Sequence, residues 1–353
     1  MRIRAVFVDR DKTYLSRLVT TLNAKMSDKL EARSFSDPEY MYDYVKDIKN
    51  AVVIVNEEIP VDFGKIPESV SFGYLVEMGG VAECGGQKAI CKYQKVEDLY
   101  RDILNLFSEK AANDYKLQAK TDNEKVFVLT SPNGGSGVST LACAFAVKKA
   151  REGKKVCYLN WEDFGNTAMY FEEEVKYSMS DVLFAVKSKK ANVAMKLESF
   201  LQLDSTGVEY FASCKNPHDI FSMTENDVET IMQEFVFAKE YEYIVIDMNF
   251  SMRRVFQRVI CDYPTEIFLV SDGSESGNSK VRKCLSVFQM MEQENDCNLI
   301  GKTRLIYNDM SKRTDCSIVE QPVKTLGAVN RFGQATNRQI MEEIAKESIF
   351  DSL

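Results

Sequence analysis

The sequence lacks several features that would define a membrane, metal or disulfide protein. Its 353 residues contain no run of 18 apolar residues, so no transmembrane helix is predicted. It has one histidine, His218, and no Cys-x-x-Cys pair among its nine cysteines. A zinc site needs such ligands close together, so none is predicted. The odd, scattered cysteines are typical of reduced thiols in a cytoplasmic protein.

Positive charge is also scarce. The chain has 45 lysines and arginines against 53 acidic residues, which gives a net charge of −8 and a pI of about 5.1. This balance argues against nonspecific binding to nucleic-acid phosphates, which requires a basic surface. The N-terminal stretch reaches Asp9 before any long apolar region, so it predicts a first strand and not a signal peptide.

Strand-like and helix-like segments alternate through the chain. The length is enough for two domains, and the alternation predicts an α/β class with two doubly wound parallel sheets. The hydrophobic pattern predicts strands at 3–9, 51–56, 72–78 and 88–93, with helices at 14–26 and 96–107. Further strands are predicted at 126–131, 154–161, 207–213, 241–248, 265–272 and 303–309. The predicted domains are 1–107 and 125–353, separated by residues 108–124, a charged linker or helix extension.

A glycine-rich loop follows the strand at 126–131, in the stretch Ser-Pro-Asn-Gly-Gly-Ser-Gly-Val-Ser-Thr. Gly134, Gly135 and Gly137 allow positive φ and leave room for a ligand beside the backbone. Successive N–H groups can then surround a phosphate, assisted by the dipole of the helix that starts near Ser139. The Ser139 hydroxyl can coordinate Mg²⁺. Taken alone, the loop also fits a purely structural turn.

Polar residues at three other predicted strand ends support a nucleotide site. Asp247 ends the strand at 241–248, where a carboxylate near Mg²⁺ is expected. Acidic residues including Glu162 follow the strand at 154–161, at the edge where doubly wound sheets bind ligands. Asn308 ends the strand at 303–309, and its amide could bind adenine.

Residues 125–353 resemble the ParA/MinD family of deviant Walker A ATPases. The family loop reads Lys-Gly-Gly-x-Gly-Lys-Ser/Thr-Thr. The corresponding residues, all expected to bind the nucleotide, are Asn133, Gly134, Gly135, Ser136, Gly137, Val138, Ser139 and Thr140. The family's Asp-x-Asp segment corresponds to Asn160–Glu162, its Walker B aspartate to Asp247 and its adenine-reading asparagine to Asn308. Its Leu-Gly-x-x-Pro segment resembles 325–332, with Asn330 in place of proline. The resemblance implies ATP and Mg²⁺ as cofactors, with Ser139 and Asp247 at the metal.

Both lysines of that family pattern are absent. The signature lysine, which in the family reaches a partner's nucleotide, is replaced by Asn133, and the Walker lysine is replaced by Val138. Losing one charged hydrogen bond weakens binding about ten- to a hundredfold, whereas losing a cation at the transferred phosphoryl group can cost about 10³–10⁵ in rate. The pattern therefore predicts ATP binding with slow or absent hydrolysis. Glu162 is the candidate for orienting the attacking water. Replacement cations are sought among Arg253, Arg254, Lys280 and Arg282, without a spacing argument that selects one.

The first domain resembles a response-regulator receiver domain. Asp9 and Asp11 follow its first strand, where receivers bind magnesium, and Lys92 ends the strand at which receivers have an invariant lysine. Asn56 stands at the phosphoacceptor position, and Glu77 lies in the region of the usual switch threonine. An asparagine amide is not a useful nucleophile toward a phosphodonor. The sequence thus predicts a pseudo-receiver that serves in dimerisation or partner docking.

A receiver-like domain followed by a ParA/MinD-like ATPase is similar to the arrangement of the TadZ/CpaE family of Flp (tad) pilus assembly. That resemblance implies a cytoplasmic, ATP-bound homodimer near the inner face of the membrane at a cell pole, which recruits pilus assembly and secretion machinery. One alternative is a MinD- or ParA-type ATPase that cycles on membrane or DNA. The mixed, acidic segment 337–353 is unlike a basic membrane-binding helix. The other alternative is a nucleotide-free scaffold.

Overall fold

The structure is a computed structural model of the whole chain. It describes residues 2–27, 29–46, 48, 51–108, 124–172, 176–188, 193–236, 241–295, 297–310, 322–351 and 353. These residues form two compact units, of which the first is Met1–Lys116 with Ser188–Ser199 and the second is Leu117–Lys187 with Phe200–Leu353. The predicted linker lies outside the described residues, apart from Ser108 and Glu124 at its two ends.

The first unit is a six-stranded sheet in the order β2-β1-β3-β4-β6-β5. All neighbouring strands are parallel except the short antiparallel pair β5 and β6. The strands are β1 Ile3–Val8, β2 Leu30–Phe35, β3 Ala51–Asn56, β4 Ser71–Val76, β5 Glu83–Cys84 and β6 Gln87–Cys91. The helices are α1 Lys12–Lys25, α2 Pro38–Val45 and α3 Val96–Ser108. The predicted doubly wound class is therefore confirmed for this unit.

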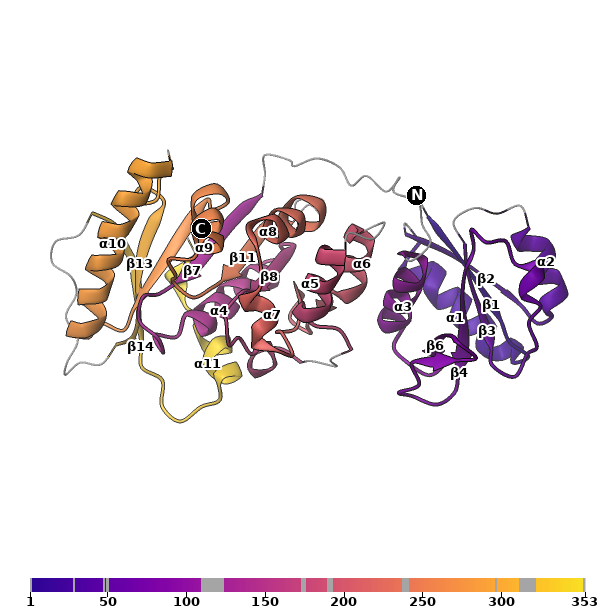
Figure 1. The fold of residues 1–353 in the computed structure, drawn as a ribbon. Helices are drawn as coiled ribbons and strands as arrows, with labels where there is room; N and C mark the ends of the chain where they lie inside the picture. Colours follow the sequence, from indigo (N-terminus) through magenta and orange to yellow (C-terminus); the bar gives the residue numbers. More distant parts are fainter. Residues whose placement is uncertain are drawn as a thin grey trace. The chain divides into compact units, whose positions relative to one another are not determined.

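Helices cover both faces of this first sheet, as Figure 1 shows. Phe7 and Ile54 pack with α1 and α3 on one face, and their chain neighbours Val6 and Val55 pack with α2 on the other. Because strand side chains alternate between faces, an almost continuous apolar run is needed to fill both cores. The strand order reverses between β1 and β3, so the polar residues after these two strands meet at the usual ligand-binding edge.

The second unit is an eight-stranded sheet in the order β14-β13-β12-β7-β11-β8-β10-β9, in which only β9 pairs antiparallel. Its strands are β7 Lys125–Thr130, β8 Val156–Asn160, β9 Gln202–Leu203, β10 Val208–Tyr210, β11 Tyr243–Asp247, β12 Glu266–Ser271, β13 Thr303–Met310 and β14 Lys324–Asn330. Its helices are α4 Val138–Arg151, α5 Met179–Ser188, α7 Pro217–Phe221, α8 Glu225–Ile231, α9 Arg254–Asp262, α10 Glu275–Asn295 and α11 Asn337–Ile344. A further helix, α6 Val193–Phe200, falls largely within the first unit.

The core of the second unit is aromatic and is closed by the last residues of the chain. Phe127 and Phe145 pack edge to face with ring centroids 4.7 Å apart, and Phe145 also contacts Phe350. Phe350 is fully buried in the same cluster as Met341 and Ile344 of α11. The segment 337–353 is therefore packed on its own domain, as its mixed composition predicts. The segment resembling Leu-Gly-x-x-Pro falls mainly on strand β14.

Candidate nucleotide site

The glycine loop joins central strand β7 to helix α4, with the local geometry expected of a phosphate-binding turn. Gly135 and Gly137 have φ of 76° and 81°, in the left-handed region that favours glycine. Gly134, predicted to use the same freedom, does not have a positive φ. The loop precedes a helix of 14 residues, so its N–H groups and the helix dipole act at the same place.

Ser139, at the start of α4, contacts the acidic segment after β8. Its Oγ donates a 2.7 Å hydrogen bond to Oε2 of Glu162. The bond leaves the hydroxyl lone pairs available to a cation, because the proton is directed at the carboxylate. The structure thus brings together two residues that were predicted separately, as a magnesium ligand and as a water-orienting carboxylate.

Asp247 lies at the end of β11, completely buried. Its Oδ2 accepts a 2.7 Å hydrogen bond from the Tyr158 hydroxyl and a longer one from Nδ2 of Asn160. Its Oδ1 has no hydrogen-bond partner among the described residues. Burial, followed by the charge of Glu162, raises the pKa of the Asp247 carboxyl well above its ordinary value. A bound cation would offset both effects.

Ser139 and Asp247 carry oxygen atoms that fit a Mg²⁺ ion bound beside the glycine loop. The buried, unsatisfied Oδ1 of Asp247 and the oriented hydroxyl of Ser139 are the hard oxygen donors that this ion prefers. In the part of the chain that the structure describes, no group of three or more His, Cys, Asp or Glu side chains is arranged to hold a metal by itself. Phosphate oxygens would therefore have to supply part of the coordination, as they do for Mg²⁺ in phosphate-transfer enzymes.

Asn308 lies against the glycine loop. Its Nδ2 donates a 2.8 Å hydrogen bond to the carbonyl oxygen of Ser136, and a Cβ added to Gly137 would lie only 2.2 Å from that nitrogen. The Asn308 side chain is thus partly engaged in fixing the loop. The structure thus shows a loop-fixing contact for Asn308, and its adenine-binding role stays a prediction.

The two positions at which the resembling family has lysines have different surroundings. Asn133 lies between two charged groups, with its Nδ2 2.9 Å from Oδ2 of Asp272 and its Oδ1 2.9 Å from Nζ of Lys280. Val138 is partly buried and packs against the aromatic core of the domain. Neither residue could supply a cation itself.

A cavity of about 410 Å³ opens beside the loop. It is lined by residues 131–139, Glu162, Tyr170, Met248, Asn249 and Phe250. Tyr170 also contacts the Thr140 hydroxyl at 3.0 Å, which fixes that side chain on the first turn of α4. The buried Ser136 has no hydrogen-bond partner for its Oγ among the described residues, although it lines this cavity. A buried hydroxyl of this kind can form a hydrogen bond with a ligand that enters the cavity.

In the first unit, the Asp9 carboxylate is bonded to neighbouring groups of its own domain. Lys92 Nζ lies 2.9 Å from Oδ2 of Asp9, and both side chains are 4% exposed. Asn56 donates to the same oxygen at 3.1 Å, and the Asp11 N–H donates to Oδ1 at 2.8 Å. Glu77 lies 3.8 Å from Lys92. Asn56 therefore serves as a structural hydrogen-bond donor to Asp9, at the position of a phosphoacceptor.

Some residues of the nucleotide site were not predicted from the sequence. The sequence pattern predicts only a buried strand at Tyr158, yet the register between β8 and β11 places its hydroxyl beside Asp247. Asp272 follows β12 at the same sheet edge as the glycine loop, a position that could have identified it.

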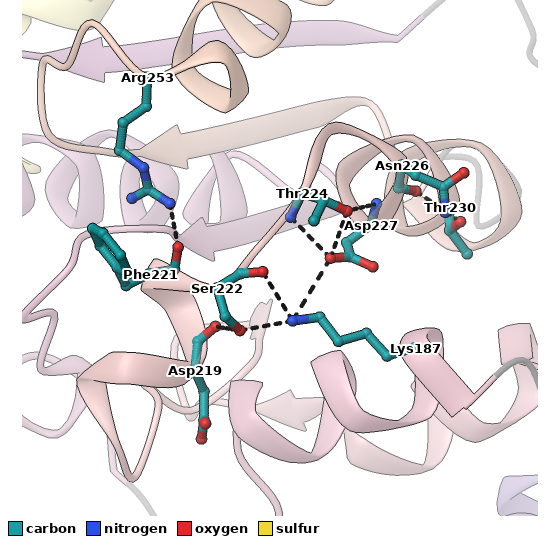
Figure 2. A network of polar contacts seen from close by, with 9 residues as sticks. All are labelled: Lys187, Asp219, Phe221, Ser222, Thr224, Asn226, Asp227, Thr230 and Arg253. Carbon is teal, nitrogen blue, oxygen red and sulfur yellow. Dashed lines mark hydrogen bonds and ion pairs between the residues drawn. The ribbon is translucent and has the colours of Figure 1, made fainter.

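Among the four candidate replacement cations, Lys280 contacts the loop, whereas Arg253 is bound to Asp163 and to the Phe221 carbonyl oxygen. Figure 2 shows the Arg253 contact with Phe221.

Comparisons with known proteins give one family match and a set of similar solved structures. Residues 1–108 match the model of the family described as "TadZ-like, receiver domain". No curated protein matches the chain significantly. A solved ParA family ATPase from Chlorobium tepidum is 18% identical, with a TM-score of 0.51, and the match covers 65% of this chain and 96% of that one.

Two further solved structures have lower scores. A plasmid partition protein from Borrelia burgdorferi is 16% identical, with a TM-score of 0.49 and coverage of 65% of this chain and 99% of that one. A chain of the MinC:MinD cell division protein complex of Aquifex aeolicus is 19% identical, with a TM-score of 0.47 and coverage of 65% of this chain and 93% of that one. Residues 1–108 thus match a TadZ-like receiver domain, and the described part of the second unit has a fold similar to that of a ParA family ATPase.

Proposed function

We propose that this chain is an ATP-binding localisation and assembly protein of a Flp (tad) pilus system, which acts as a nucleotide-bound homodimer and recruits pilus machinery to a cell pole. The observation that carries the proposal is a complete phosphate-binding loop without its lysines. Gly135, Gly137 and Ser139 keep the geometry of the loop, while Asn133 and Val138 occupy the two lysine positions. The TadZ-like receiver domain at residues 1–108 supports the pilus assignment.

In this proposal the backbone N–H groups of the loop and the start of α4 bind the phosphates. Mg²⁺, when bound, supplies positive charge to the phosphate oxygens. Ser139 would contact it, and the buried Asp247 would lie close by. Glu162 is positioned beside Ser139 to orient a water molecule, but the missing loop cations would lower the rate of phosphoryl transfer by about 10³ or more. ATP would therefore persist as a stabilising ligand of the dimer.

The packing of residues 337–353 does not fit a membrane-inserting helix in that segment. A helix that inserts its apolar face into lipid must be free to leave its own domain. Here Phe350 is fully buried, and Lys149 donates to the carbonyl oxygen of Leu353 at 3.1 Å. Within the described residues, no helix has the length and apolarity to cross a membrane.

Two measurements test the assembly role. Light scattering of the purified wild-type chain with ATP and Mg²⁺ should give the mass of a dimer. The Ser139→Ala variant should give the mass of a monomer under the same conditions. In a bacterium that makes tad pili, a fluorescent fusion should form a polar focus, and deletion of the protein should abolish the pili. An unchanged monomer together with normal pili in the deletion strain would reject the proposal.

A further inference from the structure

The glycine loop is surrounded by acidic side chains. Glu162 is bonded to Ser139, and Asp272 is bonded to Asn133. A polyphosphate bound in this loop would lie close to these two acidic side chains, and repulsion between like charges is strong where water is excluded. Mg²⁺ neutralises only part of that charge. A protein cation close to the loop would therefore strengthen the complex.

Lys280 on α10 is that cation. Its Nζ lies 2.9 Å from Oδ1 of Asn133. The other end of the Asn133 amide donates to Asp272, which in turn accepts from the N–H and hydroxyl of Ser274. Asn133 is thus oriented with its oxygen toward Lys280. An ammonium group has three donors, so the contact with Asn133 leaves donors for phosphate oxygens.

The other candidate cations are engaged or distant. Arg253 pairs with Asp163 at 3.2 Å and lies over the Phe221 ring at 4.6 Å from its centroid. Lys187, which is not one of the four candidates, is bonded to Ser222 and lies 3.9 Å from Asp227, in the network drawn in Figure 2. Arg254, Arg282 and Lys280 are all exposed, and among the described residues only Lys280 of these three has a hydrogen bond to the loop.

We propose that Lys280, positioned by Asn133, binds the phosphates of a nucleotide held in the glycine loop of the same chain. The inference rests on the proposed function, because it requires the loop to bind a polyphosphate. An independent observation also indicates a ligand here: Ser136 is 2% exposed, lines the cavity, and has an unpartnered Oγ among the described residues.

The test is calorimetry of the full chain with ATP and Mg²⁺, comparing wild type with Lys280→Gln, Lys280→Arg and Lys283→Gln. Lys283 is exposed on the same helix and controls for a general change of charge. Loss of a charged hydrogen bond predicts that Lys280→Gln weakens binding about tenfold. Lys280→Arg should retain affinity within a few-fold, and Lys283→Gln should match wild type. Equal melting temperatures for the four proteins would show that all are folded.

The possible failures are distinguishable. If wild type binds ATP and Lys280→Gln binds it equally well, the assignment of Lys280 is overturned while the proposed function stands. Equal weakening by Lys280→Gln and Lys283→Gln also overturns it, because the effect would then be long-range. If wild type binds neither ATP nor inorganic tripolyphosphate, both the assignment and the proposed function are overturned.

Discussion

Asn308 and Gly137 are so close that the second residue cannot carry a side chain without displacing the first. A Cβ on Gly137 would lie 2.2 Å from Nδ2 of Asn308, the atom that also donates to the Ser136 carbonyl oxygen. The strand end that bears Asn308 and the loop that binds phosphate are therefore one packed unit. A substitution of either residue should displace the other.

Gly137→Ala should destabilise the second unit by about 1–3 kcal/mol, because it adds backbone strain at φ 81° to the clash with Asn308. Gly134→Ala is the matched control, since φ is not positive there and a Cβ would meet nothing within 4 Å. Chemical denaturation of both variants measures the difference. Equal stability of the two would show that the loop is looser than this packing implies.

Val138→Lys should tighten ATP binding about tenfold, because it places a charged donor at the position of the Walker lysine. It should also cost about 1 kcal/mol of stability, since Val138 is partly buried against the core. Val138→Met is the control, with a long side chain that carries no charge. Calorimetry with ATP and Mg²⁺ gives the affinities. An affinity of Val138→Lys equal to that of Val138→Met would count against the proposed loop geometry.

Lys92→Met should destabilise the receiver domain by about 3 kcal/mol, because it leaves Asp9 buried without its cationic partner. Lys65→Met is the comparison, since the Lys65 pair with Glu39 is exposed and its loss should have little effect. Denaturation of the full chain should show one transition that shifts in Lys92→Met alone. A similar small shift in both variants would contradict a structural role for the Asp9–Lys92 pair.

The same pair predicts a dependence of stability on pH. Burial by itself would raise the pKa of Asp9, but the hydrogen bonds from the Asp11 amide, Lys92 and Asn56 hold it below its ordinary value of 3.8. A carboxyl with a lowered folded-state pKa stabilises the fold above its unfolded pKa, and this stabilisation is lost as the pH falls through the folded value. The unfolding transition that shifts in Lys92→Met should therefore occur at lower denaturant concentration below about pH 5. The double variant Asp9→Asn, Lys92→Met should lose less stability than wild type over that pH range. Parallel curves of stability against pH for the two proteins would refute the prediction.

The sequence was a good guide wherever a short segment is buried on both sides. Strand β3 was predicted at its observed bounds. All six of its residues are buried, and all are apolar except Asn56, which ends the strand. Strand β2 was missed, since its charged residues Glu31 and Arg33 interrupt the apolar pattern of an edge strand. The short antiparallel strands β5 and β9 have too few residues to give a periodic signal.

The site was predictable where its residues belong to strand ends or to the loop itself. Glu162 and Ser139 were identified from the chain and do meet in the structure. Lys280 could not be selected from four cations, because its approach to Asn133 depends on how α10 packs over the sheet. The bond between Tyr158 and Asp247 depends on strand register, which local sequence does not specify.

The central claim is that the loop binds ATP but scarcely hydrolyses it. The most direct measurement combines calorimetry with ATP and Mg²⁺ and phosphate release on the same sample, with Glu162→Gln as the control for turnover at this site. We predict saturable binding with phosphate release close to that of Glu162→Gln. Absence of binding would contradict the claim outright, and rapid release that is abolished by Glu162→Gln would show an active ATPase instead.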